Sequence, residues 1–531
     1  MKSLKKKFFA IFLIIYLFIG SFNSINTGIS FDERHEELNW NFHVNLVKEI
    51  SDVIINGKKF DTNKFENNIQ HFVGYGIGFQ LISQPIQSVI KDLIAKQKNL
   101  DNYGAKLVAK HFVVFLFFFI SGLFFYLILR KLIDNENFYI LGSITYLTYP
   151  YLFGQSMFSP KDIPFMSVWL ICTHLSFVLF ENIIHNNKIK IKYTIIFSIL
   201  TAYLLSIRIA GILIFIQYLI ILICYLNLYK INLIQFLKKY YKDLILFSLV
   251  LIFFIFLFYP TFWIDPLLFI EAIKVNTSHF NNVGTTTLGE IMYSQNLPVT
   301  YLIIWFSVKI PLLIMIGLFL LPITEKNIFK DKIKSILFGS ILLSFLIISL
   351  ILILRRVHLY DEIRQVLFLV PLIFIIGLTS LFIFSKKLFY LCGILTVVFF
   401  TAENIRINPY QYVWFNLPSR FLDLTKDFEL EYQGISGREI SKYLIKENTK
   451  KNCILATPIW SVEPFMNNTQ FDCFDIWQKI DTDYKRPFLA VQNVRNLKRS
   501  NPYKCTTIHE TYFNLFFHKK KFVTGKLLRC E

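Results

Sequence analysis

Long apolar runs alternate with short polar loops over residues 1–402 of the chain. Most runs approach the ~20 apolar residues that cross the ~30 Å hydrocarbon core of a bilayer as an α-helix. The first run follows a lysine-rich start and precedes no small-residue cleavage site, so we interpret it as an uncleaved span. The pattern predicts about eleven membrane-spanning helices, near residues 8–25, 112–132, 138–153, 163–180, 193–206, 211–229, 244–259, 299–322, 336–354, 366–384 and 389–400.

One apolar stretch, from Tyr193 to Tyr229, is too long for a single crossing. As one helix it would extend about 55 Å, well beyond the hydrocarbon core. Two short crossings joined by a tight turn at Arg208-Ile-Ala-Gly211 fit better. The charge pattern supports the split, because merging the two crossings would move later lysine clusters to the other side of the membrane.

Loops on alternate sides of the membrane differ in charge. If the N-terminus is cytoplasmic, the inner loops are short and basic, as the positive-inside rule requires; they lie at 130–131, 188–192, 238–242, 326–334 and 386–387. The outer side then holds a long first loop (26–110) and a tail (403–531). We therefore predict an all-α polytopic protein of a bacterial-type inner membrane. Residues 1–402 would form its transmembrane domain, and the tail a soluble extracytoplasmic α+β domain.

Composition supports this class. The 531 residues are 54% hydrophobic and only 17% charged, which is more apolar than a soluble protein of this length. The net charge of +20 does not indicate nucleic acid, because no nucleic-acid-binding module is recognisable. Lysines at cytoplasmic loop ends, contact with anionic lipid and a polyanionic lipid substrate account for the charge instead.

The first outer loop contains apolar residues at helical spacing. Ile86, Val89, Ile90, Leu93 and Ile94 recur along one face of a predicted helix, with polar residues between them. Such an amphipathic helix either lies on the outer membrane surface or packs against the helical bundle. The sequence fits both interpretations equally.

The seven cysteines fall into two groups. Those in the predicted spans, Cys172, Cys224 and Cys392, are interpreted as small apolar residues. Four cysteines in an exported tail suggest two disulfides, with three possible pairings. A zinc site is less favoured because no C-x-x-C spacing is present. The disulfide candidates are Cys453, Cys473, Cys505 and Cys530.

Two acidic segments follow spans on the predicted outer side. The first is Ser30-Phe-Asp-Glu-Arg-His-Glu-Glu37, and the second is Phe158-Ser-Pro-Lys-Asp-Ile-Pro164. Carboxylates at a membrane surface can take a proton from an acceptor hydroxyl or hold a divalent metal. By charge alone, a solvated loop and a helix start capped by Asp162 are the more ordinary interpretations.

Several cations lie inside apolar runs or at their ends, where a charge is costly and usually has a function. Arg grips phosphate oxygens with a planar fork, whereas Lys provides a point charge. Lys309 fits snorkelling to the interface equally well. Two arginines of a short outer loop depart from the positive-inside pattern, which favours a function. The candidates are Arg208, Lys309, Arg355, Arg356 and Arg364.

The order of these features resembles the GT-C superfamily of membrane glycosyltransferases. The nearest likeness is to the branch of family 39, the protein O-mannosyltransferases and the aminoarabinose transferases. An acidic pair after the first span, a second Asp in the next outer loop and a many-span bundle with an outer domain carry the resemblance. It extends to about Arg438. Stretches that agree with bacterial members of this branch are 296–301, 309–311, 360–365, 408–416 and 431–438.

The resemblance implies inverting transfer of a hexosyl or pentosyl group from a polyprenyl-phosphate donor to a lipid, glycan or protein acceptor. Asp32 would be the general base, Glu33 its support and Asp162 the second acidic partner. Candidates for the donor phosphate would be Arg34, Lys309, Arg355, Arg356 and Arg364. Arg34 departs from the aminoarabinose-transferase pattern by directly following the acidic pair, which leaves open which cation of the first loop reaches the phosphate.

A divalent metal, held by Asp32 and Asp162, is left open because members of the superfamily differ in metal dependence. No nucleotide site is expected, since the sequence contains no Walker lysine motif and no G-x-G-x-x-G before a helix. The alternative function is a membrane transporter or lipid flippase. It would share the spans and Lys309, but it should show repeated halves or broken mid-membrane helices, and the sequence contains no internal repeat.

Overall fold

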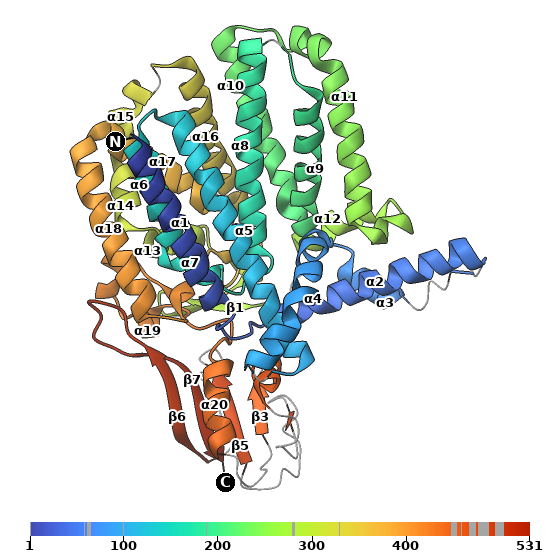
Figure 1. The fold of residues 1–531 in the computed structure, drawn as a ribbon, viewed down its shortest axis with the longest axis vertical. Coiled ribbons are helices and arrows are strands. Elements are labelled where there is room, and N and C mark those ends of the chain that lie inside the picture. The colour runs from blue at the N-terminus through green and yellow to red at the C-terminus, as the bar shows by residue number, and fades with distance from the viewer. Residues whose placement is uncertain are drawn as a thin grey trace.

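The computed structural model describes residues 2–530 apart from 58, 61–64, 99, 187, 279–281, 329, 448–453, 458, 467–473, 476–487 and 494–503. Long helices form a bundle with a smaller β-containing region at one end (Figure 1). Within the described residues, eight helical segments are long and apolar enough to cross a membrane. They are α1 (Lys2–Ser24), α5 (Asn102–Leu132), α8 (Asp162–Asn186), η1–α10 (Ile209–Leu213, Ile214–Tyr229), α11 (Leu233–Phe258), α16 (Lys332–Leu354), η4–α17 (Arg364–Leu369, Val370–Phe384) and α18 (Lys386–Arg406).

The other predicted spans are shorter or broken helices. α9 (Ile191–Ile207) is apolar but short, and α13 (Tyr301–Lys309) meets α14 (Leu312–Phe319) at an angle of 116°. Pro311 lies in that break and lacks the N–H that a continuous helix needs. A further break divides α6 (Glu136–Thr148) from α7 (Pro150–Gln155). The predicted fold class is confirmed, with eight to nine candidate spans by length and composition in place of about eleven.

The predicted break at Arg208 is present. α9 ends at Ile207, Arg208 has extended backbone, and a 3₁₀ turn leads into α10. As a result, the loops that join α8 to α9 and α10 to α11 lie at the same end of the bundle as the N-terminus, whereas the tail lies at the opposite end (Figure 1).

The first long loop folds into α2 (Glu33–Asn56), α3 (Glu66–Phe72) and α4 (Gly78–Lys98). α2 projects sideways from the bundle (Figure 1). α4 contains the predicted amphipathic segment. Ile94 is buried, whereas Val89 and Leu93 are 75% and 63% exposed. The helix therefore packs against the protein along one edge and leaves apolar side chains free along another.

The tail region contains α19 (Leu424–Asp427) and α20 (Gly437–Glu447). α20 packs its apolar face, including Ile440 and Leu444, against a five-stranded sheet of order β4-β3-β5-β7-β6. β3 pairs in parallel with β4 and β5, and β7 pairs antiparallel with β5 and β6, so the region is α+β. The strands are β3 (Ile454–Thr457), β4 (Phe474–Asp475), β5 (Phe488–Asn493), β6 (Cys505–Phe513) and β7 (Phe522–Cys530).

A short insertion separates α11 from α13, and its Thr287 forms a β-bridge with Phe428 of the tail. It contains α12 (Leu268–Ser278) and a hairpin of β1 (Gly284–Thr287) and β2 (Glu290–Tyr293). The remaining short elements are α15 (Leu321–Ile328), η2 (Pro260–Trp263), η3 (Ser294–Asn296), η5 (Gln411–Val413), η6 (Pro418–Phe421), η7 (Ile459–Ser461) and η8 (Glu463–Phe465).

Buried ion pairs and hydrogen bonds hold the tail on the bundle. Arg420 makes a bidentate pair with Glu403 at the end of α18, both distances being 2.9 Å, and donates to the carbonyl of Phe516. Arg438 donates to the carbonyls of Ile25 and Thr27, both at 2.9 Å. Because the loop after α1 and the tail are tied directly together, residues near position 30 have a defined position.

The described cysteines include one disulfide in the tail and three free thiols in the helices. Cys505 and Cys530 face each other across β6 and β7 and form a disulfide. The other two disulfide candidates, Cys453 and Cys473, lie outside the described residues. The free thiols among the described residues are Cys172, Cys224 and Cys392 in α8, α10 and α18.

Candidate functional site

Asp32 ends the loop between α1 and α2. The backbone N–H of Phe31 donates to the carbonyl of Gln433 at 3.0 Å, which anchors this loop on the tail. Asp32 stands at the N-cap of α2, but its side chain makes no capping hydrogen bond. The carboxylate is instead directed at neighbouring elements and remains 46% exposed.

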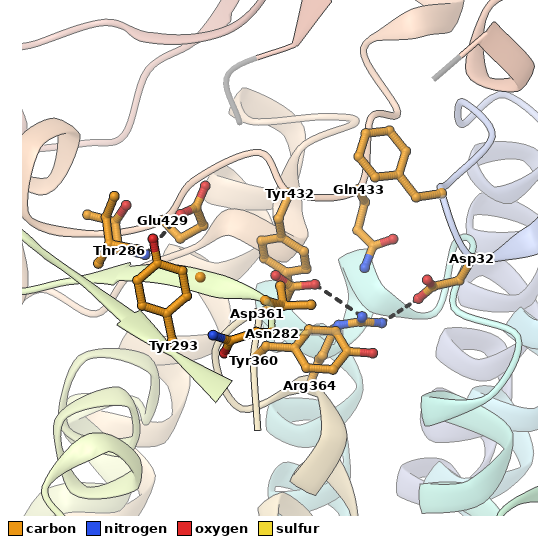
Figure 2. A pocket seen from close by; sticks show the side chains of 14 residues that line it. Asp32, Asn282, Thr286, Tyr293, Tyr360, Asp361, Arg364, Glu429, Tyr432 and Gln433 are labelled. Carbon is orange, nitrogen blue, oxygen red and sulfur yellow. Dashed lines mark hydrogen bonds and ion pairs between the residues drawn. The ribbon is translucent and has the colours of Figure 1, made fainter. Parts of the chain in front are cut away.

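Arg364 is the centre of a cluster of carboxylates. Its Nη1 lies 2.5 Å from Asp32 Oδ2, and its Nη2 lies 3.1 Å from Asp361 Oδ2 (Figure 2). Nη1 also lies 3.5 Å from Asp162 Oδ2, whose other oxygen is 2.5 Å from Arg208 Nη1. The ion-pair network thus joins the loop after α1, the start of α8, the break after α9 and the start of η4.

Two cavities meet at this network. They share Asp32, Tyr360 and Arg364 in their walls. The larger, of about 670 Å³, is lined mainly by aromatic and hydrogen-bonding groups, including Asn282, Thr286, Tyr293, Glu429, Tyr432 and Gln433 (Figure 2). The smaller, of about 350 Å³, contains the cations, including Lys161 and Arg208.

Cationic, neutral and acidic side chains lie side by side in the walls of the smaller cavity. Lys161 Nζ lies 2.6 Å from Glu36 Oε1 and 3.7 Å from the centre of the Tyr75 ring. Burial and the nearby Lys161 lower the pKa of His35 to about 4, so this imidazole is neutral at pH 7. The positive charge in the cavity therefore comes from Lys161, Arg208 and Arg364.

The charge state of Asp32 follows from its contact with Arg364. Burial alone would raise the pKa of Asp32, but the Arg364 guanidinium, through its charge and its hydrogen bond, holds that pKa below its usual range. Asp32 is therefore ionised at neutral pH. Burial raises the pKa of Tyr360 to about 12, so this neighbour keeps its proton.

The backbone that delivers Asp361 is strained. Asp361 and Glu362 have φ angles of 54° and 69°, a region that side chains other than glycine rarely adopt. The N–H of Asp361 donates to Thr285 Oγ1 at 2.9 Å, and Glu362 pairs with Lys309 at 2.7 Å. These contacts keep the turn in place, so that Asp361 contacts Arg364 while Glu362 contacts Lys309.

Lys309 lies behind the site rather than in it. Its ammonium is fully buried, pairs with Glu362 and lies 4.0 Å from the centre of the Phe415 ring. Burial raises the pKa of Glu362 to about 7, against the opposing effect of Lys309. Neither residue lines the two cavities, so the pair supports the strained turn that carries Asp361.

Four other predicted residues do not line the cavities. Glu33 is fully buried, with its carboxylate 2.8 Å from His111 Nε2 and accepting from the N–H of Ser30. Arg34 is exposed over the Trp460 ring, 5.1 Å from its centre. Arg355 and Arg356 are exposed at the end of α16.

The hairpin side of the larger cavity was not predicted from the sequence. Glu429 Oε2 accepts from the N–H of Thr286 at 3.0 Å, which joins the tail to β1. Leu288 and Gly289 at the hairpin tip both have positive φ. The sequence signal was weak: a glycine between two short segments, one of them threonine-rich, is compatible with a hairpin, but it does not show which loop the hairpin meets.

The two carboxylates proposed as metal ligands share an arginine. Asp32 and Asp162 both lie within 3.5 Å of Arg364 Nη1. In the part of the chain that the structure describes, no group of three or more His, Cys, Asp or Glu is arranged to hold a metal ion.

Comparisons with known proteins found solved structures that are similar at low sequence identity. No family model and no curated protein matches the chain. ArnT from Cupriavidus metallidurans bound to undecaprenyl phosphate is similar in structure, with a TM-score of 0.48 and 8% identity over 98% of this chain and 97% of that chain. The apo state of that ArnT gives 0.43 and 10% over 83% and 87%.

Proposed function

We propose that this chain is a glycosyltransferase that moves a sugar from a polyprenyl-phosphate donor to an acceptor at the membrane surface, with inversion at the anomeric carbon. One observation supports this function best. The Asp32–Arg364 ion pair lies where a cavity lined by cations meets a larger one lined by aromatic and hydrogen-bonding groups. This reaction needs a phosphate site and a carboxylate base on opposite faces of the transferred sugar.

The donor phosphate would bind in the smaller cavity. Lys161, Arg208 and Arg364 line it, and charge-assisted hydrogen bonds to phosphate oxygens are among the stronger polar contacts. A phosphate leaving group needs neutralisation of its charge more than protonation. Asp162 and Asp361 would orient the two guanidiniums, since each carboxylate is almost fully buried against them.

Asp32 would act as the general base. The acceptor oxygen attacks the anomeric carbon, the bond from that carbon to the phosphate oxygen breaks with its electron pair staying on the phosphate, and the hydroxyl proton moves to Asp32. Inversion requires one base opposite the leaving group and no covalent intermediate. A phosphate arriving at Arg364 would compete with Asp32 for that guanidinium. Loss of the cation would raise the basicity of Asp32 when the donor is in place.

We assign the site to the extracytoplasmic side of an inner membrane. The lysine-rich loops lie at the end of the bundle opposite Asp32, and the positive-inside rule puts such loops in the cytoplasm. A disulfide within the tail supports the same orientation, because disulfides persist in oxidising compartments.

Lipid-linked intermediates in cells with and without the gene test this function. Cells that lack it should accumulate a polyprenyl-phosphate sugar, and purified protein in vesicles should consume that lipid. The Asp32→Asn variant should fold and insert but leave the lipid intact. If the lipid instead moves from one leaflet to the other without losing its sugar, the chain is a flippase and the proposal fails.

A further inference from the structure

Another cavity, of about 410 Å³, lies at the end of the bundle opposite Asp32. The segment Arg364–Phe384 connects the two ends. Arg364 lies in the candidate site, whereas Thr379 and Phe382, about 20 Å further along the helix, line this second cavity. Its other walls come from the end of α5 and the residue after it, from α16 and the segment before it, and from the start of α18.

Three lysines line the cavity: Lys330, Lys334 and Lys386. No ion pair links any of them to an acidic group within the described residues. Asp331 lies between two of them in sequence, but its carboxylate caps α16 by accepting from the N–H groups of Ile333 and Lys334. The positive charge of the cavity therefore comes from the three lysines.

The hydroxyl of Thr379 is a second, independent sign of a ligand. Thr379 is only 1% exposed, and its Oγ1 has no hydrogen-bond partner among the described residues. Threonines inside helices commonly donate to a carbonyl in the preceding turn, and a buried polar group without a partner is costly. A ligand oxygen in the cavity would supply the missing partner.

The remaining lining identifies the class of ligand. Leu132, Phe338, Phe382 and Ile383 form apolar walls below the lysines. A free phosphate ion would gain nothing from these walls, whereas a lipid would place its acyl chains along them. Basic pockets between membrane helices on the cytoplasmic side favour anionic headgroups.

We propose that this cavity binds the phosphate headgroup of an anionic membrane phospholipid. The phosphate contacts the three lysines and the Thr379 hydroxyl, and the acyl chains lie against Phe338 and Phe382. The site is separate from the Asp32–Arg364 network and does not depend on the chemistry proposed there.

Lipid binding to the purified full-length protein in detergent tests the proposal. Phosphatidylglycerol should remain bound in native mass spectrometry and raise the melting temperature, whereas phosphatidylcholine should do neither. The triple variant Lys330→Gln, Lys334→Gln, Lys386→Gln should bind phosphatidylglycerol at least roughly tenfold more weakly. A control with the same charge change away from the cavity, Lys238→Gln, Lys239→Gln, Lys242→Gln, should bind it normally.

Two further measurements keep the test decisive. Thr379→Val keeps the side-chain shape, so it should fold, and it should weaken phosphatidylglycerol binding severalfold through loss of one hydrogen bond. Inorganic phosphate at millimolar concentration should not raise the melting temperature. The proposal is overturned if the lysine triple and Thr379→Val both bind like the unmodified protein, if phosphatidylcholine binds equally, or if inorganic phosphate alone reproduces the effect.

Discussion

Arg364 donates a hydrogen bond to Asp32 across 332 positions of the chain, with 2.5 Å between Nη1 and Oδ2. Arg364 begins the segment that leads into α17, and Asp32 ends the loop after α1. Asp32 is the most exposed carboxylate on this guanidinium, at 46% against 2% for Asp162 and 3% for Asp361. Asp32 lines both cavities, whereas Asp361 lines only the larger and Asp162 only the smaller.

Removing the basicity of Asp32 should stop the reaction while donor binding persists. Asp32→Asn keeps the size and hydrogen-bonding capacity of the side chain, but an amide cannot take up the proton of the attacking hydroxyl. The single-turnover rate should fall roughly 10²–10⁴-fold, the usual contribution of a positioned acid or base. Rapid mixing with the donor in nanodiscs measures this rate. Asp92→Asn on exposed α4 is the matched control. Full turnover by Asp32→Asn would move the base to another residue, with Asp162 the next candidate.

The arginines that line the smaller cavity should contribute to the affinity for the donor lipid, whereas the exposed arginines should not. Arg208→Gln removes a cation from the smaller cavity, so donor affinity should fall roughly ten- to hundredfold, as expected for a lost charge-assisted hydrogen bond. Arg356→Gln removes the same charge from the exposed end of α16 and should leave the affinity unchanged. Equilibrium binding of the donor lipid compares them. Equal loss in the two variants would mean that long-range charge, and not contact, holds the phosphate.

The pH dependence of the reaction should report the Asp32–Arg364 contact. Arg364 lowers the pKa of Asp32, so the base stays ionised until the pH falls below the usual range of a carboxyl. In Arg364→Gln the cation is gone while the burial that raises the pKa remains. The acid limb of kcat/KM, which reports the free enzyme, should therefore move to higher pH. Arg34→Gln, on an exposed arginine, should not move it. An unchanged limb in Arg364→Gln would show that another group titrates.

Replacing one member of the buried Lys309–Glu362 pair should destabilise the protein more than replacing both members. Lys309→Met leaves Glu362 buried without its cation and should cost about 3–5 kcal/mol. The double variant Lys309→Met, Glu362→Met should recover much of that loss, because no uncompensated charge remains. Thermal denaturation of the three proteins in detergent measures both effects. If the double variant is less stable than Lys309→Met, the attraction between the two charges stabilises the folded protein, and neutralising the buried charge of Glu362 is not the main role of Lys309.

The disulfide should stabilise the tail without affecting donor binding. Cys505 and Cys530 enclose a loop with a sequence separation of 25, for which the chain-entropy model gives about 3.5 kcal/mol. Replacing both with Ser should speed proteolysis of the tail, and the cross-linked peptide should be absent from unreduced digests. Cys224→Ser with Cys392→Ser, in the spans, is the control. Free thiols at both tail positions in the unmodified protein would contradict an oxidising location.

The sequence alone determined where most of the long apolar helices lie, although it predicted about eleven spans where eight to nine are long and apolar enough in the described residues. Apolar length is a local property, because each helix satisfies its own backbone hydrogen bonds and lipid selects only for hydrophobic runs of sufficient length. The break at Arg208 could be predicted for the same reason, since thirty-odd apolar residues exceed one crossing. The identity of Asp32, Asp162 and Arg364 as candidate site residues also came from the sequence, through charges in unusual places and a resemblance.

Only the tertiary structure decided which charges face one another. Asp32 and Glu33 are adjacent and chemically alike, yet Asp32 contacts Arg364 whereas Glu33 points inward to His111. Arg356 and Arg364 share one loop, yet only Arg364 is buried in the network. Helix rotation and the packing of segments hundreds of positions apart determine these contacts, and no local pattern encodes them. The strained turn at Asp361 and Glu362 persists for the same reason, because Thr285 and Lys309 hold it from distant elements.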